Sequence, residues 1–187
     1  MPKYFITMLL LINVLFFSGK SLAFYNENIS FSGDCLTKDY KQLNLKEVGS
    51  APFSVLFWDI YNSILYTESG KYSPENLSDT VIFEIEYYRD ITSKDLLERT
   101  IEQWQYLDVP ENHYKPFVPL LQEIWPDIAA GDKLTMVVHH HQSIFYFNGE
   151  KIGLIKQKEF SRLFLDIWLS PNTSEKKLRA QLLGGIQ

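Results

Sequence analysis

The three consecutive histidines His139, His140 and His141 are the residues whose type most directly suggests chemistry, because imidazole is a common metal ligand. Their spacing suits a metal poorly. Neighbouring side chains of a strand point to opposite faces, so only His139 and His141 can share one face. A zinc site needs three or four converging ligands, and no cysteine or aspartate stands at ligand spacing beside them. We therefore predict a solvated strand end here, with no metal site and no cofactor.

Nucleophilic and redox chemistry have little support in the sequence. The chain contains no Gly-x-Ser-x-Gly motif for a serine nucleophile and no glycine loop of the kind that binds phosphate. Its single cysteine, Cys35, has no partner for a disulfide or a redox pair, so we expect a buried or idle thiol. The motifs therefore predict no catalytic residue.

Residues 1–23 have the composition of an export signal. Lys3 supplies a positive charge, and residues 4–17 form an apolar run of roughly the 7–15 residues that a signal peptide needs. Small residues follow at Ser21 and Ala23, where a signal peptidase selects them. The run is shorter than the ~20 residues of a membrane span. We predict cleavage after Ala23 and a periplasmic protein that is not integral to the membrane.

The predicted mature chain, residues 24–187, is acidic and long enough for one domain with a sizeable core. Removing Lys3 and Lys20 from the 18 basic residues leaves 16 against 23 acidic residues. This balance argues against nucleic acid and against an anionic membrane surface as partners. We expect a single domain, because no linker rich in proline or glycine divides the chain.

The elements that must position any site begin with a long β segment. We predict it over residues 48–67, where Phe53, Val55 and Phe57 alternate with smaller or polar neighbours. A loop follows over residues 68–79, and then a strand with one wet face over residues 80–88. A helix is predicted to begin at Thr92 as N-cap, with Asp95 three residues on, and to end before Pro110.

The second half of the chain repeats this alternation of helices and strands. We predict a helix over residues 114–128, then strands over 133–140, 143–147 and 151–156, with a hairpin turn at Asn148-Gly149. A helix through residues 160–168 and a short helix capped by Asn172 follow. Four tryptophans are expected in the core: Trp58, Trp104, Trp125 and Trp168. The order predicts an α+β domain, an antiparallel sheet with a layer of helices packed on one face.

Several stretches together resemble the chalcone isomerase-like family, and within it a branch of uncharacterised exported bacterial proteins. These stretches cover most of the mature chain in the family's order: VGSAPFSVLFWDIYNSILYT (48–67), EYYRDITSKDLLERTIEQW (86–104), IWPDIAAGDKLTM (124–136), FYFNGEKIGLI (145–155), FLDIWLSPNTS (164–174) and LRAQLLG (178–184). The resemblance implies the chalcone isomerase-like fold, in which an antiparallel sheet carries a layer of helices. It also implies a ligand cleft between the sheet and the helices.

The resemblance does not imply the activity of the plant enzymes, which is chalcone cyclisation. Plant chalcone isomerases steady a substrate oxyanion with an arginine just before the long strand, and this sequence has residues 49–52, Gly-Ser-Ala-Pro, in that neighbourhood. Three further plant active-site positions, occupied there by tyrosine, asparagine and threonine, correspond to Thr92, Arg99 and Tyr61. None of the four plant residues is kept, so we reject chalcone cyclisation.

The fatty-acid-binding relatives of the fold offer a closer match. They hold a carboxylate with an arginine and tyrosines, and one of those tyrosines corresponds to Tyr61. Arg99 is placed to replace the missing cation, with Arg89 as a second candidate. We predict a non-catalytic protein that binds an apolar, fatty-acid-like ligand through Tyr61, Arg99 and Thr92. The structural alternative stays open, with Tyr61 as a core tyrosine and Arg99 as an exposed helix residue.

Two alternatives from other functional classes also stay open. An isomerase-type enzyme would need titratable groups that converge in the cleft, such as Tyr61 with Arg99 or Tyr87 with Glu102. An accessory protein would bind a protein partner and would fill its cleft with its own side chains. An open apolar cavity lined by Tyr61 would favour ligand binding, and a filled cleft would favour the accessory protein.

Overall fold

The computed structural model describes residues 43–75 and 80–185, all within one compact unit, Cys35–Gln187. The predicted leader, its cleavage site and Cys35 lie outside the described residues. The strands are β1 (Lys46–Val55), β2 (Trp58–Thr67), β3 (Val81–Tyr87), β4 (Lys133–His139), β5 (Gln142–Phe147) and β6 (Glu150–Ile155). The helical segments are α1 (Ser93–Tyr106), α2 (Glu111–Tyr114), η3 (Lys115–Phe117), α3 (Val118–Ile124), α4 (Lys158–Leu169) and α5 (Lys176–Leu182).

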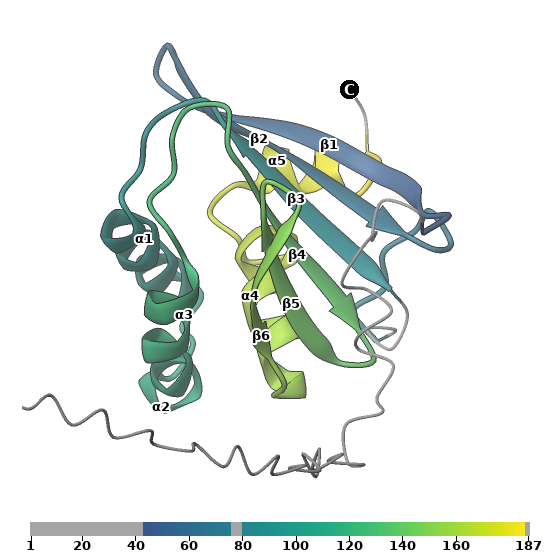
Figure 1. Ribbon diagram of the computed structural model, residues 1–187. Helices are drawn as coiled ribbons and strands as arrows, with labels where there is room; N and C mark the ends of the chain where they lie inside the picture. Colours follow the sequence, from purple (N-terminus) through teal and green to yellow (C-terminus); the bar gives the residue numbers. More distant parts are fainter. Residues whose placement is uncertain (1–42, 76–79, 186–187) are drawn as a thin grey trace, which may run out of the picture. The chain divides into compact units, whose positions relative to one another are not determined.

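The strands form one antiparallel sheet in which each strand pairs with its neighbour in sequence, in the order β1-β2-β3-β4-β5-β6 (Figure 1). Tight turns produce this order in the second half. Asn148 and Gly149 join β5 to β6 with φ angles of 51° and 89°. His140 and His141 join β4 to β5 with φ angles of 46° and 64°. A two-residue turn in which both residues have a positive φ has a backbone twist that matches the right-handed twist of the flanking strands. The predicted Asn-Gly hairpin is thus confirmed.

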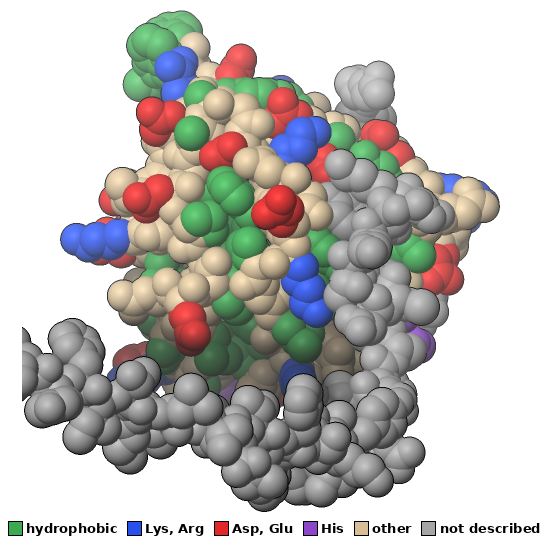
Figure 2. Space-filling view, viewed as in Figure 1, with side chains coloured by type: hydrophobic (Ala, Val, Ile, Leu, Met, Phe, Trp, Pro, Cys, Tyr) green, Lys and Arg blue, Asp and Glu red, His purple; other side chains and the backbone are tan. Residues whose placement is uncertain are grey.

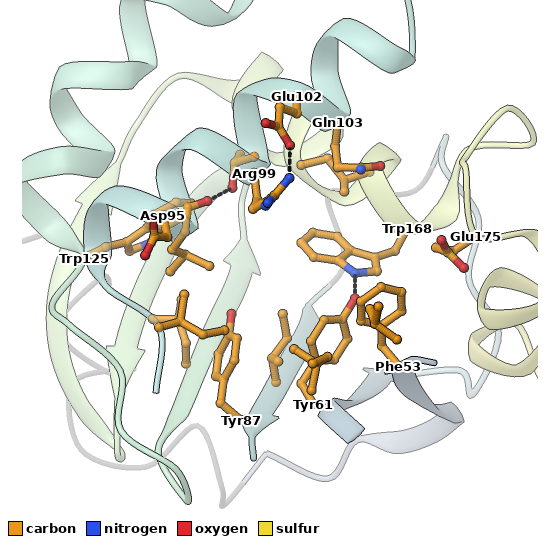
Figure 3. Close-up of a pocket in the computed structure, with 18 of the residues that line it drawn as sticks. Phe53, Tyr61, Tyr87, Asp95, Arg99, Glu102, Gln103, Trp125, Trp168 and Glu175 are labelled. Carbon is orange, nitrogen blue, oxygen red and sulfur yellow. Dashed lines mark hydrogen bonds and ion pairs between the residues drawn. The ribbon is translucent and has the colours of Figure 1, made fainter. Parts of the chain in front are cut away.

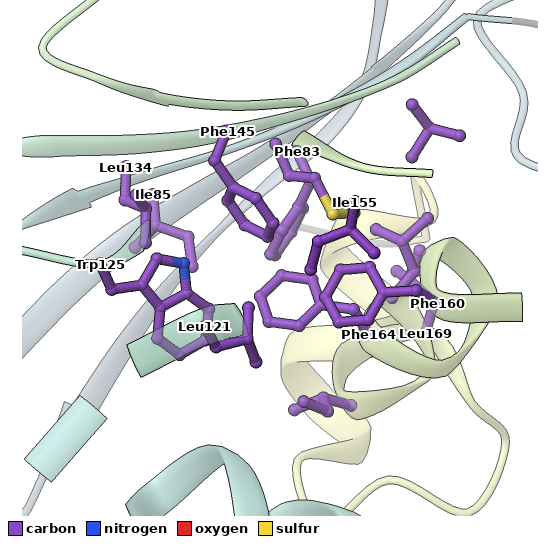
Figure 4. Packing of buried hydrophobic residues seen from close by; sticks show 14 of the residues in the cluster. Phe83, Ile85, Leu121, Trp125, Leu134, Phe145, Ile155, Phe160, Phe164 and Leu169 are labelled. Atoms are coloured by element: carbon purple, nitrogen blue, oxygen red, sulfur yellow. The ribbon is translucent and has the colours of Figure 1, made fainter. Parts of the chain in front are cut away.

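The helices pack on one face of the sheet. Alternate side chains of the strands meet side chains of α1, α3, α4 and α5 in one hydrophobic core. Figure 4 shows the aromatic centre of this core, where Phe83 and Phe145 of the sheet face Phe160 and Phe164 of α4. The rings of Phe145 and Phe164 meet edge to face, with centroids 5.8 Å apart. The predicted α+β architecture is confirmed.

The opposite face of the sheet carries a smaller apolar cluster. Ile82 of β3, Val137 of β4, and Ile144 and Tyr146 of β5 are buried there. Partly buried Leu43, Leu45, Tyr66 and Leu154 pack against the cluster. The face of β3 that was predicted to be solvent-exposed is therefore only partly exposed. Its glutamates are half-buried, while Ile82 is 5% exposed.

The prediction of one long β segment over residues 48–67 was wrong, because the segment is a hairpin. Val55 of β1 lies opposite Trp58 of β2, and Leu56 and Phe57 form a two-residue turn. The turn contains no glycine, proline or asparagine, so it gives no sequence signal. Leu56 itself takes a φ of 56°. Trp58 is consequently 59% exposed and is not the predicted core residue, whereas Trp104 and Trp125 are buried as expected.

Two helix predictions were wrong in extent. The segment expected over residues 114–128 is a succession of α2, η3 and α3, and it begins earlier and ends before Pro126. Pro116 and Pro119 lack an N–H, so they fit the first turns of short helices better than the interior of a long one. The last helix, α5, has Glu175 and not Asn172 as its N-cap. In the described ranges, no helix combines the length and the apolar character needed to cross a membrane.

Candidate functional site

A cavity of about 620 Å³ lies between the sheet and helices α1 and α4. Its volume falls within the range of about 300–1,000 Å³ that is typical of small-molecule sites. Most of its wall is aliphatic or aromatic, and these residues are Phe53, Val55, Ile60, Tyr61, Ile85, Tyr87, Ile91, Leu96, Trp125, Leu134, Phe164, Ile167 and Trp168. The protein's own side chains leave this space open, and Tyr61 lines it. The open cavity favours ligand binding over an accessory protein with a filled cleft.

Tyr61 and Tyr87 stand side by side on neighbouring strands. They are directly opposite each other in the β2–β3 register, and their ring centroids are 5.9 Å apart. Figure 3 shows both rings rising from the sheet toward the cavity. The indole N–H of Trp168 donates to the Tyr61 hydroxyl over 3.0 Å. Phe53 stacks on the Tyr61 ring with centroids 5.0 Å apart. These two contacts fix the Tyr61 ring and leave its O–H free to donate.

Both phenols are held in their neutral form. Burial raises the pKa of Tyr61 to about 12, and the hydrogen bond from Trp168 offsets only part of that rise. Burial also raises the pKa of Tyr87. The two hydroxyls are therefore hydrogen-bond donors at ordinary pH. The same desolvation disfavours a phenolate base at either position, whereas a neutral phenol can still donate a hydrogen bond or a proton.

Arg99 lies on α1 across the cavity from the tyrosines (Figure 3). Its side chain is 78% exposed, and its Nη1 pairs with Oε2 of Glu102 over 2.6 Å. Of the described residues that line the cavity, Arg99 is the only cation, whereas the carboxylates there are those of Asp90, Asp95, Glu102 and Glu175. The rim is thus acidic overall. A ligand carboxylate would have to compete with Glu102 for the guanidinium.

Thr92 positions α1 and does not line the cavity. As predicted, it is the N-cap of α1: its hydroxyl accepts from the N–H of Asp95 over 3.1 Å. The same hydroxyl donates to Oδ2 of Asp95 over 2.7 Å. The structure therefore brings Tyr61 and Arg99 to one cavity but does not bring Thr92 to it. The second arginine candidate, Arg89, lies over the ring of Trp58, with its Cζ 4.6 Å from the ring centroid.

The histidine run forms a strand end and a turn. Nδ1 of His139 lies 2.9 Å from the Thr80 hydroxyl, and partial burial lowers the pKa of His139, which favours its neutral form. His140 and His141 are the turn residues between β4 and β5. Within the part of the chain that the structure describes, no three His, Cys, Asp or Glu side chains gather closely enough to hold a metal ion.

Sequence reasoning missed the two residues that hold Tyr61 in place. Phe53 was recognised only as part of an alternating strand, and Trp168 only as part of the apolar stripe of α4. That spacing marks a residue as facing inward, but it does not distinguish the wall of a cavity from a filled core. Tyr87 was considered only with Glu102, and that carboxylate pairs with Arg99.

Comparison with known proteins agrees with this architecture. The profile of a family described as chalcone isomerase-like matches residues 29–184. An uncharacterised protein of Haemophilus influenzae is 25% identical over 137 residues, which are 73% of this chain and 67% of that protein. A crystal structure of a fatty-acid binding protein of Arabidopsis thaliana has a TM-score of 0.57 at 13% identity, over 75% of this chain and 87% of that one. At this identity the structural likeness shows the fold alone. Because the family profile spans nearly the whole sequence, this chain belongs to the chalcone isomerase-like family.

Proposed function

We propose that this protein is a carrier that binds an apolar, acyl-type ligand non-covalently in the cavity between sheet and helices. The observation that carries the proposal is the open cavity of about 620 Å³, apolar on most of its wall, into which two neutral phenols project. The name of the Arabidopsis protein that shares the fold, a fatty-acid binding protein, supports the same class of ligand.

We assign the polar end of the ligand to the hydroxyls of Tyr61 and Tyr87 and its chain to the apolar wall. Each hydroxyl can donate one hydrogen bond, and a carboxylate has two oxygens to accept them. Arg99 has a secondary role in this arrangement, because its guanidinium is exposed and already paired with Glu102. The tyrosine pair, and not the arginine, is expected to determine affinity.

Tyr87→Phe and Tyr61→Phe are each expected to weaken binding of a long-chain fatty acid by about tenfold, the effect of losing one hydrogen bond to a charged group. Isothermal titration calorimetry with purified protein measures this change. Tyr87→Phe is the cleaner variant, because among the described residues no hydrogen bond to its hydroxyl is broken. Tyr61→Phe also leaves the indole N–H of Trp168 without its acceptor.

Tyr106→Phe is the matched control, since Tyr106 is 58% exposed on α1 and does not line the cavity. The Tyr106→Phe protein should bind the fatty acid as tightly as the unaltered protein does.

A long-chain alcohol serves as the neutral ligand: Arg99→Gln should weaken binding of the acid and leave binding of the alcohol unchanged. The proposal is wrong if the unaltered protein binds neither compound, or if both tyrosine variants bind as tightly as the control.

We also propose that the protein acts in the periplasm after removal of residues 1–23. The support is the positive charge of Lys3, the apolar run over residues 4–17 and the small residues at Ser21 and Ala23. Protein purified from its own cells should have an intact mass that corresponds to a chain starting at Phe24. A mass that includes the leader, or recovery with the cytoplasmic fraction, would contradict export.

A further inference from the structure

The β1–β2 hairpin ends in an apolar tip made of Val55, Leu56, Phe57 and Trp58. These side chains are 48%, 87%, 96% and 59% exposed. Among the described residues, four of the six exposed large hydrophobic side chains lie in this hairpin tip, so the exposure is concentrated and not scattered. Figure 2 shows hydrophobic side chains projecting at the top left, where Figure 1 has the β1–β2 turn. Concentrated exposure of this kind marks an interaction surface.

The backbone of the hairpin tip is strained at Leu56. Its φ of 56° lies in the left-handed region, where two-residue hairpin turns usually have glycine or asparagine. A bulky residue is rare there because its Cβ approaches the neighbouring backbone. Burial of the side chain does not compensate for this strain, since Leu56 is 87% exposed. The strained residue presents its side chain outward, and this points to a contact outside the molecule.

The residues behind the hairpin tip suit a lipid surface. Arg89 lies over the ring of Trp58, 4.6 Å from its centroid, and Tyr88 beside it is 41% exposed. Tryptophan and tyrosine favour the headgroup level of a bilayer, and an arginine can extend its guanidinium to the phosphates. Asp59, held by the Ser54 hydroxyl over 2.6 Å, adds a negative charge at the same end. With 16 basic against 23 acidic residues in the predicted mature chain, these residues fit a zwitterionic surface and not an anionic one.

The hairpin tip is continuous with the ligand cavity. Val55 and Ile60 line the cavity and also a shallow depression that they share with Leu56, Trp58 and Arg89. The β-bulge between β1 and β2 occurs at this point, where the register shifts between Phe53 and Ser54. Apolar surface therefore extends from the hairpin tip to the interior of the cavity.

We propose that the hairpin tip inserts into the surface of a zwitterionic lipid bilayer and brings the end of the cavity lined by Val55 and Ile60 close to it. Leu56 and Phe57 enter the acyl region, and Trp58 and Arg89 lie among the headgroups. Membrane insertion depends on the hairpin tip alone. Passage of an acyl ligand between the bilayer and the cavity rests in addition on the proposed function.

Vesicles of phosphatidylcholine brominated on the acyl carbons next to the headgroups test the insertion, because bromine there quenches the fluorescence of a tryptophan at the boundary between headgroups and chains. The full protein should be quenched, and Trp58→Phe should remove the quenching that comes from the hairpin tip. A brominated chain that enters the cavity would still quench Trp125 and Trp168, which line it. Leu56→Asn combined with Phe57→Ser should reduce partitioning by about tenfold or more. Asparagine tolerates the positive φ, so this variant should fold as well as the original.

Tyr106→Ser is the control for loss of an exposed aromatic elsewhere, and it should partition like the unaltered protein. The double variant should still bind a long-chain fatty acid in solution, which separates failure of insertion from failure of ligand binding. Equal quenching of the full protein and of Trp58→Phe, partitioning that survives the double variant, or binding to anionic vesicles only would overturn the proposal. If the protein associates with itself through the hairpin tip and does not bind vesicles, the hairpin tip is an interface between two copies of the chain and the proposal is wrong.

Discussion

Replacement of Trp104 by alanine is expected to lower the free energy of unfolding by about 4 kcal/mol, within the range for large aromatic residues removed from a core. Trp104 of α1 is completely buried and stacks on Tyr114 of α2, with ring centroids 5.4 Å apart. Its Nε1 donates to the backbone carbonyl of Leu163 in α4 over 3.0 Å. The side chain thus joins the two helices that cover the cavity. Alanine would leave a void that rigid neighbours cannot fill.

Urea denaturation measures this loss, and two variants separate its causes. Trp104→Phe keeps most of the buried volume but removes the donor to Leu163, so it should cost about 1–2 kcal/mol. Tyr106→Ala, two positions on and 58% exposed, should stay within about 0.5 kcal/mol of the original protein. If Trp104→Ala cost no more than Tyr106→Ala, Trp104 would not join α1 to α4.

Replacement of Gly49 by alanine is expected to lower the free energy of unfolding by about 3 kcal/mol, the upper part of the usual range for overpacking. Helix α5 lies directly on β1 at this point. A Cβ on Gly49 would overlap the backbone oxygen of Gln181 and stand 2.9 Å from backbone atoms of Leu182. No side-chain rotation relieves a contact with backbone, so α5 would have to move away from the sheet.

Thermal unfolding followed by circular dichroism should show a Tm lower by about 6–12 °C for Gly49→Ala, the shift that corresponds to this loss in a domain of such size. Ser50→Ala, at an exposed neighbouring position of β1, is the control and should leave the Tm nearly unchanged. A Gly49→Ala protein with the Tm of the control would show that α5 does not hold this close position in solution.

The sequence predicted best those elements whose signals lie within a few residues. Thr92 and Asp95 mark the start of α1 because the cap is a contact between residues three positions apart. Asn148 and Gly149 mark a hairpin because both tolerate positive φ. The turn at Leu56 and Phe57 could not be predicted in this way. Strand pairing forms it, with Val55 opposite Trp58, although the turn residues have no preference for it.

The candidate site was predictable only in part, because the contacts that build it join residues far apart in the sequence. The family resemblance identified Tyr61 and Arg99, and both line the cavity. The contact that orients Tyr61 comes from Trp168, 107 residues further along the chain. The pairing of Tyr61 with Tyr87 depends on the exact register of β2 and β3, in which a slip of one residue would turn one ring to the other face. Neither local spacing nor composition contains this information.

The order of the strands affects how the chain folds as it emerges, whether from a ribosome or on the far side of a membrane. Each described strand after β1 pairs with the strand just before it in sequence, so the sheet can grow in the order in which the chain emerges, N-terminus first. Helix α5 breaks this order, because it packs at Gly49 against β1, the first strand of the described residues. Folding therefore cannot be completed until residues 176–182 have emerged. Until then the incomplete chain exposes the apolar surface of β1, which is where a chaperone that holds unfinished chains would bind.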